Sequence, residues 1–252
     1  MYNLNEGLIV YLQNTKHITE AALPWIIIGA ALAVFLISYM LGSLNSAIII
    51  SKAVYKDDIR RHGSGNGGLT NMLRTFGKGA AGLTLLGDVM KTVIALLITG
   101  AVFGFGYVGG VSVGGNGDGF CYLAGMCVTL GHVFPCFYRF KGGKGVLATA
   151  TMALILTPIP FVFLLLLFVL IVATSKYVSL GSVSVAVLYP IVVNGYFKFV
   201  FQNTDRMLPA FVALSTIILA ILIVWCHREN IKRISTRTER KISFKKKNED
   251  EE

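Results

Sequence analysis

The chain has 252 residues, of which 54% are hydrophobic and 14% charged, and it carries a formal net charge of +10. With a mean hydropathy of +0.68, this composition excludes a soluble globular domain, because several apolar runs reach the roughly 18 residues that cross a bilayer as a helix. The charge does not indicate a nucleic-acid partner, because nine of the 23 Lys and Arg residues follow the last apolar run, where membrane topology and anionic lipid explain them.

The apolar runs predict one all-α polytopic membrane domain with about seven transmembrane helices. It lies between a lead of mixed polarity (1–23), which has no signal-peptide pattern, and a basic tail (227–252). The run Val146–Thr174 is too long for one span, and two prolines in Pro158–Pro160 break a helix, so it predicts a fourth and a fifth span. The other expected spans are Pro24–Ser51, Gly79–Phe103, Phe120–Tyr138, Tyr177–Phe201 and Met207–Cys226.

The positive-inside rule orients these spans. With the N-terminus outside, the inside segments hold 19 basic residues and the outside segments three, while Lys91 lies within a span. The C-terminus and both glycine-rich polar loops are therefore expected on the cytoplasmic side. Near the end of the first span, small and polar residues have two open interpretations, close helix packing or the wall of a polar cavity: Gly42, Ser43, Asn45 and Ser46.

The first glycine-rich segment is Gly63–Arg74, with the sequence GSGNGGLTNMLR. It follows no strand, so its formal GxGxxG pattern does not indicate a dinucleotide fold. A flexible loop is one interpretation. The other is a phosphate-binding segment, because hydroxyl and amide groups offer hydrogen bonds and arginine binds phosphate with two donors. Its candidate residues are Asn66, Thr70, Asn71 and Arg74.

The second glycine-rich segment is Gly131–Val146, with the sequence GHVFPCFYRFKGGKGV. It is not a Walker A loop, because no Ser or Thr follows its last lysine. A plain basic turn is possible, but glycine backbone N–H groups beside lysines also suit an anion. The candidate substrate-binding residues are Lys141, Gly142, Gly143, Lys144 and Gly145.

Four ionisable residues lie in or at the ends of apolar runs. Asp88 and Lys91 are three residues apart and share a helix face, which predicts a buried ion pair, an anion site, or both. His132 and His227 are either hydrogen-bonded structural residues or groups that accept a proton from a hydroxyl. Asn230, beside Glu229, is a further candidate for a polar network at the start of the tail.

Four segments together resemble the bacterial acyl-phosphate:glycerol-3-phosphate acyltransferases, a family of integral membrane enzymes. They are Gly63–Arg74, Gly131–Val146, KYVSLGS at Lys176–Ser182 and HRENIKR at His227–Arg233. The resemblance implies transfer of a fatty acyl group from acyl phosphate to the 1-hydroxyl of glycerol 3-phosphate. The products would be lysophosphatidic acid and phosphate, formed at the cytoplasmic face of a bacterial plasma membrane without metal or cofactor.

The same resemblance assigns roles to residues. It ties Ser64, Arg74, His227 and Asn230 to activity, Glu229 to structural integrity, and Gly142, Gly143 and Gly145 to glycerol-phosphate binding. Two departures are Thr92 where the family often has glycine after the second-span lysine, and Leu147 within the usual GGKGVAT pattern. The proton acceptor stays open among His132, His227 and the donor's phosphate.

Glycerol 3-phosphate, acyl phosphate and membrane lipids are thus the expected partners, with Lys91, Lys141 and Lys144 among the groups available for two phosphates. The alternative is a transporter of a phosphorylated metabolite, which the intramembrane Asp88 and Lys91 and the broken span would suit. A non-catalytic membrane scaffold is a third possibility, but it leaves the polar segments unexplained.

Overall fold

The structure of the protein, a computed structural model, describes residues 6–16, 18–105, 107–108, 111–112, 118–200 and 207–242. The end of the predicted tail, from residue 243, lies outside the described residues. The elements are α1 (Gly7–Lys16), α2 (Leu23–Ser43), α3 (Ser46–Val54), η1 (Ile59–Arg61), α4 (Leu69–Phe103), β1 (Tyr107–Val108), β2 (Val111–Ser112), α5 (Asp118–Val133), η2 (Cys136–Tyr138), α6 (Val146–Leu156), α7 (Pro158–Ser175), α8 (Val178–Val200), α9 (Met207–Cys226) and α10 (Arg228–Ser235).

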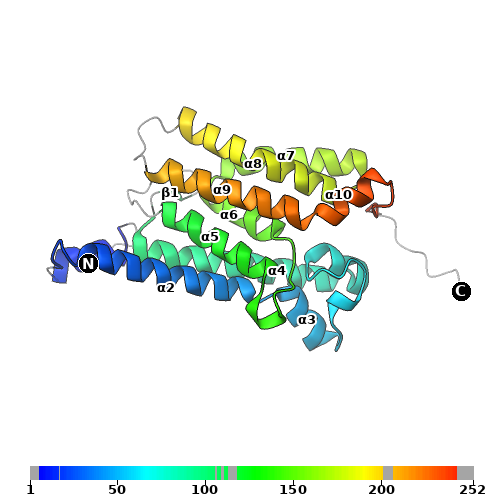
Figure 1. Cartoon of the computed structure of the whole chain (residues 1–252), viewed down its shortest axis with the longest axis horizontal. Coiled ribbons are helices and arrows are strands. Elements are labelled where there is room, and N and C mark those ends of the chain that lie inside the picture. Colours follow the sequence, from blue (N-terminus) through cyan, green and yellow to red (C-terminus); the bar gives the residue numbers. More distant parts are fainter. Residues whose placement is uncertain are drawn as a thin grey trace, which may run out of the picture.

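The long helices form a bundle around α5, which packs against α2, α4, α6 and α9 (Figure 1). Six helical segments in the described part are long and apolar enough to cross a membrane, and α6 is a shorter apolar helix of 11 residues. The break at Thr157 is confirmed, because α6 ends at Leu156 and α7 begins at Pro158. At 1.5 Å per residue α6 is about 16 Å long, so it covers only about half of the apolar thickness of a bilayer.

Two predicted span boundaries are wrong. The first span ends at Ser43 instead of Ser51, because Asn45 begins a new helix by accepting a hydrogen bond from the Ile48 amide at 3.1 Å. Helix α4, which contains the second predicted span, begins at Leu69, inside the first glycine-rich segment. Its backbone departs from helical geometry at Gly77 (φ 84°). That left-handed backbone suits glycine and separates a short polar helix from the predicted apolar span.

Close packing, and not a polar cavity, explains the small residues at the end of α2. A Cβ atom on Gly42 would lie 2.1 Å from the Val128 carbonyl oxygen of α5, and one on Gly131 would lie 2.2 Å from the Tyr39 carbonyl oxygen. Ser43 is fully buried between the same helices. The two backbones approach closely because glycine is present on both sides of the crossing.

We expect Gly42→Ala to lower the thermal unfolding midpoint of the detergent-solubilised protein, because the added methyl group must push α2 away from the α5 backbone. Overpacking of this kind costs about 1–3 kcal/mol. Gly29→Ala, on an exposed part of the same helix with nothing within 4 Å of the new Cβ, is the matched control and should leave the midpoint unchanged or raise it. Equal midpoints for the two variants would contradict this packing role.

The polar segments meet at one end of the bundle, as the charge pattern predicts. The Asn45 side-chain amide donates to the Gly67 carbonyl (3.0 Å), and the Gly67 amide donates to the Gly142 carbonyl (3.1 Å), so the two glycine-rich segments are joined. Arg60 strengthens the junction by donating to the carbonyl oxygens of Tyr138 and Lys141 at 2.9 and 3.2 Å. The tail reaches the same end, where the Ile242 amide donates to the Lys176 carbonyl at 2.9 Å.

Candidate active site

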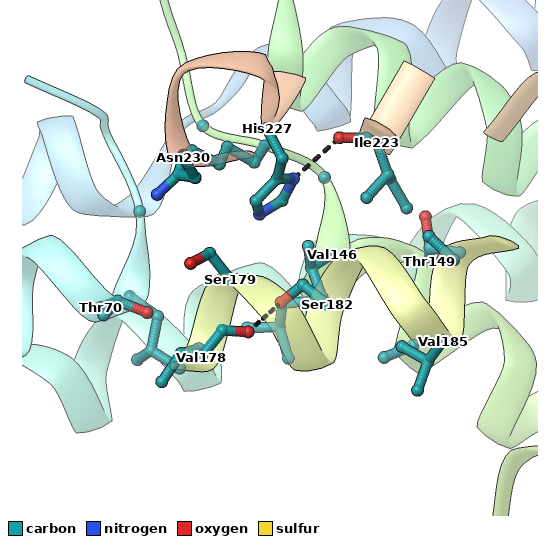
Figure 2. Close-up of a pocket in the computed structure, with 18 of the residues that line it drawn as sticks. Thr70, Val146, Thr149, Val178, Ser179, Ser182, Val185, Ile223, His227 and Asn230 are labelled. Atoms are coloured by element: carbon teal, nitrogen blue, oxygen red, sulfur yellow. Dashed lines mark hydrogen bonds between the residues drawn. The ribbon is translucent and has the colours of Figure 1, made fainter. Parts of the chain in front are cut away.

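A cavity of about 610 Å³ opens where these segments meet (Figure 2). Its polar end is formed by the two glycine-rich segments, the start of α8 and the tail, and its deeper wall is formed by apolar side chains of α6, α7, α8 and α9. Four cationic side chains line it, those of Arg74, Lys144, Arg233 and Arg240, together with two carboxylates, those of Asp88 and Glu239, among the described residues. The cavity therefore combines a basic end with an apolar interior.

Helix N-termini add to the positive potential of the polar end. The N-cap residues, which directly precede α4, α6 and α10, are Gly68, Gly145 and His227, and none of them makes a capping side-chain hydrogen bond. Residues from the first turn of each of these helices line the cavity. The first backbone N–H groups of a helix have no partner within it, and the helix dipole makes this end positive. This polar end is thus suited to anions.

Asn71 organises the first glycine-rich segment. Its side-chain nitrogen lies 3.0–3.2 Å from the carbonyl oxygens of Ile59, His62 and Asn66, and its side-chain oxygen accepts from the Ser64 amide at 3.2 Å. These bonds occupy the polar atoms of a buried side chain, so its main role is to hold the segment in shape. Ser64, Asn66, Thr70 and Arg74 also line the cavity.

Two glycines of the second glycine-rich segment do not offer their backbone donors to a ligand. The amides of Gly142 and Gly143 already donate to the carbonyl oxygens of Val133 and His132, at 3.2 and 3.1 Å. Neither donor is therefore directed at a ligand. The segment instead turns at Gly145, where φ is +78°, and brings Lys144 and the start of α6 to the cavity.

Asp88, Lys91 and His132 form a buried cluster. The Lys91 ammonium nitrogen lies 2.8 Å from the Asp88 carboxylate and 2.9 Å from His132 Nδ1, and it also donates to the carbonyl oxygens of Gly42 and Leu44. The predicted ion pair is therefore present, and Lys91 does not line the cavity. Because a charged lysine can only donate, His132 Nδ1 is the acceptor and Nε2, which lies against Gly143, carries the proton.

In His227 the protonated ring nitrogen is Nδ1, the opposite of His132. Its Nδ1 lies 2.8 Å from the Ile223 carbonyl oxygen, which can only accept, so Nε2 keeps a free lone pair. Burial, followed by the nearby Lys144 charge, lowers the pKa of His227 to about 4. The ring is therefore neutral at physiological pH, and Figure 2 shows it pointing into the cavity.

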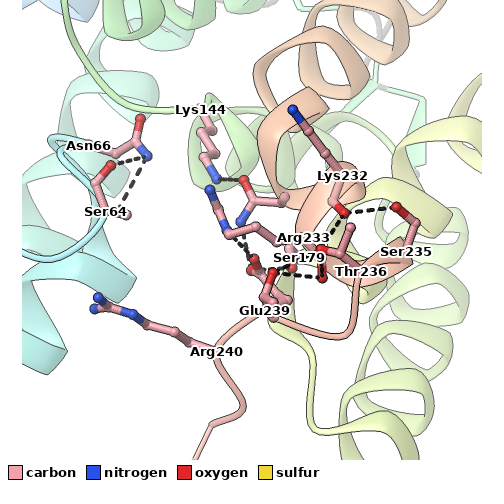
Figure 3. A network of polar contacts seen from close by, with 12 residues as sticks. Ser64, Asn66, Lys144, Ser179, Lys232, Arg233, Ser235, Thr236, Glu239 and Arg240 are labelled. Atoms are coloured by element: carbon pink, nitrogen blue, oxygen red, sulfur yellow. Dashed lines mark hydrogen bonds and ion pairs between the residues drawn. The ribbon is translucent and has the colours of Figure 1, made fainter.

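Asn230 belongs to a polar network that sequence reasoning missed in part (Figure 3). Its side-chain oxygen accepts from the Lys144 ammonium group, and its side-chain nitrogen donates to the Glu239 carboxylate at 2.7 Å. Ser179 and Arg233 donate to the same carboxylate at 2.8 and 2.7 Å. Burial raises the pKa of Glu239, but these three hydrogen bonds outweigh it and bring the pKa below its ordinary value.

The structure places the orienting carboxylate at Glu239, ten residues beyond the expected Glu229. Glu229 is exposed, and its side chain makes no hydrogen bond or ion pair within the described part of the chain. Glu239 and Arg240 are not among the predicted site residues, because membrane topology and anionic lipid are enough to explain a basic tail. A signal was present in the sequence, because Glu239 is an isolated acid among the basic residues between Arg233 and Lys241.

Most of the predicted site residues meet at the cavity. Three do not line it: Lys91, Lys141 and Gly142. Lys141 is exposed, with its carbonyl oxygen bound by Arg60, and a Cβ atom on Gly142 would lie 2.1 Å from the His132 carbonyl oxygen. Gly142 therefore allows close packing against the His132 backbone, and Lys91 contacts the His132 ring without reaching the cavity.

The fold and the site define a multi-helix integral membrane protein with an enclosed, partly basic cavity at one end. The family model described as glycerol-3-phosphate acyltransferase matches residues 32–237. The chain therefore belongs to the glycerol-3-phosphate acyltransferase family.

Curated relatives carry the same description. The chain is 38% identical over 213 residues to a glycerol-3-phosphate acyltransferase of Halalkalibacterium halodurans, covering 83% of this chain and 94% of that protein. It is 37% identical over 237 residues to one of Mycoplasmopsis agalactiae, covering 85% and 95%. Among solved structures, it is similar to PlsY (YgiH), described as an integral membrane glycerol 3-phosphate acyltransferase. The glycerol 3-phosphate form has a TM-score of 0.69 at 31% identity and covers 84% of this chain and 96% of that one.

Proposed function

We propose that the protein transfers a fatty acyl group from acyl phosphate to the 1-hydroxyl of glycerol 3-phosphate and releases lysophosphatidic acid and inorganic phosphate. The observation that carries this proposal is that one cavity combines a basic end with an apolar interior. A similar PlsY structure is described as a lysophosphatidic acid form, and it matches this chain with a TM-score of 0.66 at 30% identity.

The proposed reaction requires the basic end to hold two phosphates. Arg74 belongs to α4, whereas Lys144 comes just before α6 and Arg233 belongs to α10, and all three line the cavity. Each of these helices also begins at the cavity, where backbone N–H groups favour an anion. We assign one phosphate to Arg74 and the other to Lys144 and Arg233, which would hold the acceptor hydroxyl near the donor's carbonyl carbon by positioning alone.

The apolar interior suits an acyl chain. Residues of one face of α8 line the cavity from Ser179 through Ser182 and Ala186 to Tyr189. These ten helical steps span about 15 Å at 1.5 Å per residue, so the chain would extend from the polar mouth deep into the bundle. The exposed Leu165 of α7 also lines the cavity, which gives a lipid-soluble donor a lateral route from the bilayer.

The two histidines suit different parts of the reaction. The Nε2–H of His132 would donate to a phosphate oxygen, and the free Nε2 of His227 would accept a hydrogen bond from the attacking hydroxyl. The hydroxyl oxygen forms a bond with the acyl carbon, and the bond from that carbon to the phosphate oxygen breaks. The departing phosphate keeps the electron pair of the broken bond and is far more basic than His227, whose pKa is about 4, so the hydroxyl proton ends on the phosphate.

We further propose that the site faces the cytoplasm of a bacterial plasma membrane. The distribution of 19 basic residues on one side against three on the other supports this orientation. Figure 1 shows α1 and α10 at opposite ends of the bundle, which an odd number of passes produces. A cytoplasmic site would reach soluble glycerol 3-phosphate directly.

Purified protein in lipid nanodiscs tests the reaction. With acyl phosphate and glycerol 3-phosphate, we expect equal amounts of released phosphate and lysophosphatidic acid, and no product when an acyl thioester replaces acyl phosphate. Product formed from the thioester alone would overturn the proposed donor. Vesicle uptake of glycerol 3-phosphate without any phosphate release would instead support transport.

The protonation of the Lys144 side chain is expected to make activity depend on pH. Burial lowers the pKa of Lys144 to about 8, so its ammonium group is charged below this pH and loses its proton above it. We expect kcat/KM for glycerol 3-phosphate to fall as pH rises through about 8, because a phosphate partner is lost. In Lys144→Arg this decline should move to higher pH, since arginine stays protonated. An unchanged pH profile in the arginine variant would show that another group causes the decline.

A further inference from the structure

The tail that follows α10 folds back over the polar end of the cavity. The Thr238 and Glu239 amides donate to the Arg233 carbonyl, and the Ile242 amide donates to the Lys176 carbonyl. Arg74 of α4 donates to the Arg240 carbonyl at 3.4 Å. Residues 238–242 are therefore attached to α10, to the turn before α8 and to α4, and this segment lies beyond the residues that the family model matches.

Glu239 is the anchor of this segment, and its carboxylate is nearly buried, with a side-chain exposure of 6%. Its oxygens accept hydrogen bonds from Asn230, Ser179 and Arg233, so one side chain joins α8, α10 and the tail. A carboxylate can only accept, and it therefore turns the Asn230 amide so that the nitrogen faces Glu239. The Asn230 oxygen is then left to face Lys144.

Arg240 follows directly and lines the cavity mouth. Figure 3 shows its side chain extending from the tail toward the side where Ser64 and Asn66 lie. The neighbouring Arg237 is also exposed but does not line the cavity. The anchored segment thus adds one cation to the polar end.

We propose that the tail completes the phosphate-binding end of the site, with Glu239 as a positioning residue for Asn230 and Lys144 and Arg240 as a direct phosphate ligand. The charge of Glu239 offsets that of Arg233, so Glu239 contributes to the site by position and not by charge. It fixes where the Lys144 ammonium group stands. This inference rests on the proposed function, whose substrates carry the phosphates.

The first experiment is a double-mutant cycle on Glu239 and Asn230 in nanodiscs. Glu239→Gln keeps the side-chain shape but replaces one acceptor with a donor that faces Arg233 or Asn230. We expect KM for glycerol 3-phosphate to rise about tenfold with a smaller change in kcat, and Asn230→Ala to do the same or more. Adding Glu239→Gln to Asn230→Ala should cost little further, because residues that act through one another are not additive. Glu20→Gln, an exposed carboxylate near the start of α2, is the charge-matched control.

The second experiment uses Arg240→Ala, whose exposed side chain can be removed without disturbing the core. We expect a rise of about fivefold or more in KM for glycerol 3-phosphate, and a weaker thermal stabilisation of the protein by inorganic phosphate. Arg237→Ala removes the same charge three residues away and should leave both values unchanged. If Glu239→Gln fails to fold, this pair still tests whether the tail binds phosphate.

The outcomes separate the two proposals. If the wild-type protein releases no phosphate from acyl phosphate, the proposed function fails. If the wild type is active but Glu239→Gln keeps its KM, or if its effect adds fully to that of Asn230→Ala, the positioning role fails. Equal effects of Arg240→Ala and Arg237→Ala would show that the tail contributes only general charge.

Discussion

Gly143→Ala is expected to lower kcat for acyl transfer by about a hundredfold. A Cβ atom at this position would lie 2.1 Å from His132 Nε2 and 2.7 Å from the Gly67 carbonyl oxygen. Neither neighbour can move freely, because Lys91 holds the buried His132 ring and Asn45 holds the Gly67 carbonyl. The segment must shift, and a displacement of about 1 Å in an active site can cost a hundredfold in rate.

Steady-state kinetics with both substrates measure this effect. Because the substitution moves both His132 and the segment that carries Lys144, we expect kcat to fall and KM for glycerol 3-phosphate to rise. A loss of phosphate binding alone would raise only KM. Gly79→Ala, on the exposed side of α4 with nothing within 4 Å of the new Cβ, is the control and should retain wild-type kinetics. A Gly143→Ala variant with unchanged kcat would show that the contact with His132 has no catalytic consequence.

His227→Phe is expected to lower kcat at least a hundredfold while KM for glycerol 3-phosphate changes little. Phenylalanine fills a similar volume but removes the Nε2 lone pair that we propose accepts a hydrogen bond from the attacking hydroxyl. A positioned side chain that takes up the hydroxyl proton in the transition state typically contributes a factor of 10²–10⁴, even when the proton is then passed to the departing phosphate. The measurement is single-turnover lysophosphatidic acid formation at saturating acyl phosphate.

His62→Phe is the matched control for His227. His62 is paired with Asp57 at 2.6 Å, is partly exposed and does not line the cavity. A similar loss of kcat in both variants would mean that the His227 effect reflects general disruption. A rise in KM without a loss of kcat in His227→Phe would instead assign the ring to substrate binding.

Several features followed directly from local sequence. The apolar runs predicted the membrane bundle, because only helices satisfy their own backbone in lipid. The Pro158–Pro160 pair predicted the break between α6 and α7, because proline removes a backbone donor and clashes with the preceding turn. The positions of lysine and arginine predicted that the glycine-rich segments and the tail share one end. Motif resemblance named the glycerol-3-phosphate acyltransferase family, and most of the residues to which it assigned roles line the cavity.

Other features depended on contacts between residues distant in sequence. Glycines 142 and 143 suggest a phosphate cradle, yet their amides bind the backbone of residues 133 and 132, which only the turn after α5 brings near. Lys91 is three residues from Asp88, but its contact with His132 depends on how α4 packs against α5. The protonated nitrogen of each histidine likewise depends on its partner across the fold.

The tail shows most clearly which features the sequence determines and which depend on the tertiary structure. The sequence by itself determined that residues after 226 are basic and lie at the membrane surface, because charge and hydropathy are local properties. Only the tertiary structure decided that Glu239, and not Glu229, orients Asn230. Glu229 lies in the first turn of α10, and its exposed side chain has no partner among the described residues. Glu239 lies beyond α10 on a segment that turns back to Ser179 of α8. A hydrogen bond requires two groups to meet in space, and residue spacing along the chain does not specify where a turn returns.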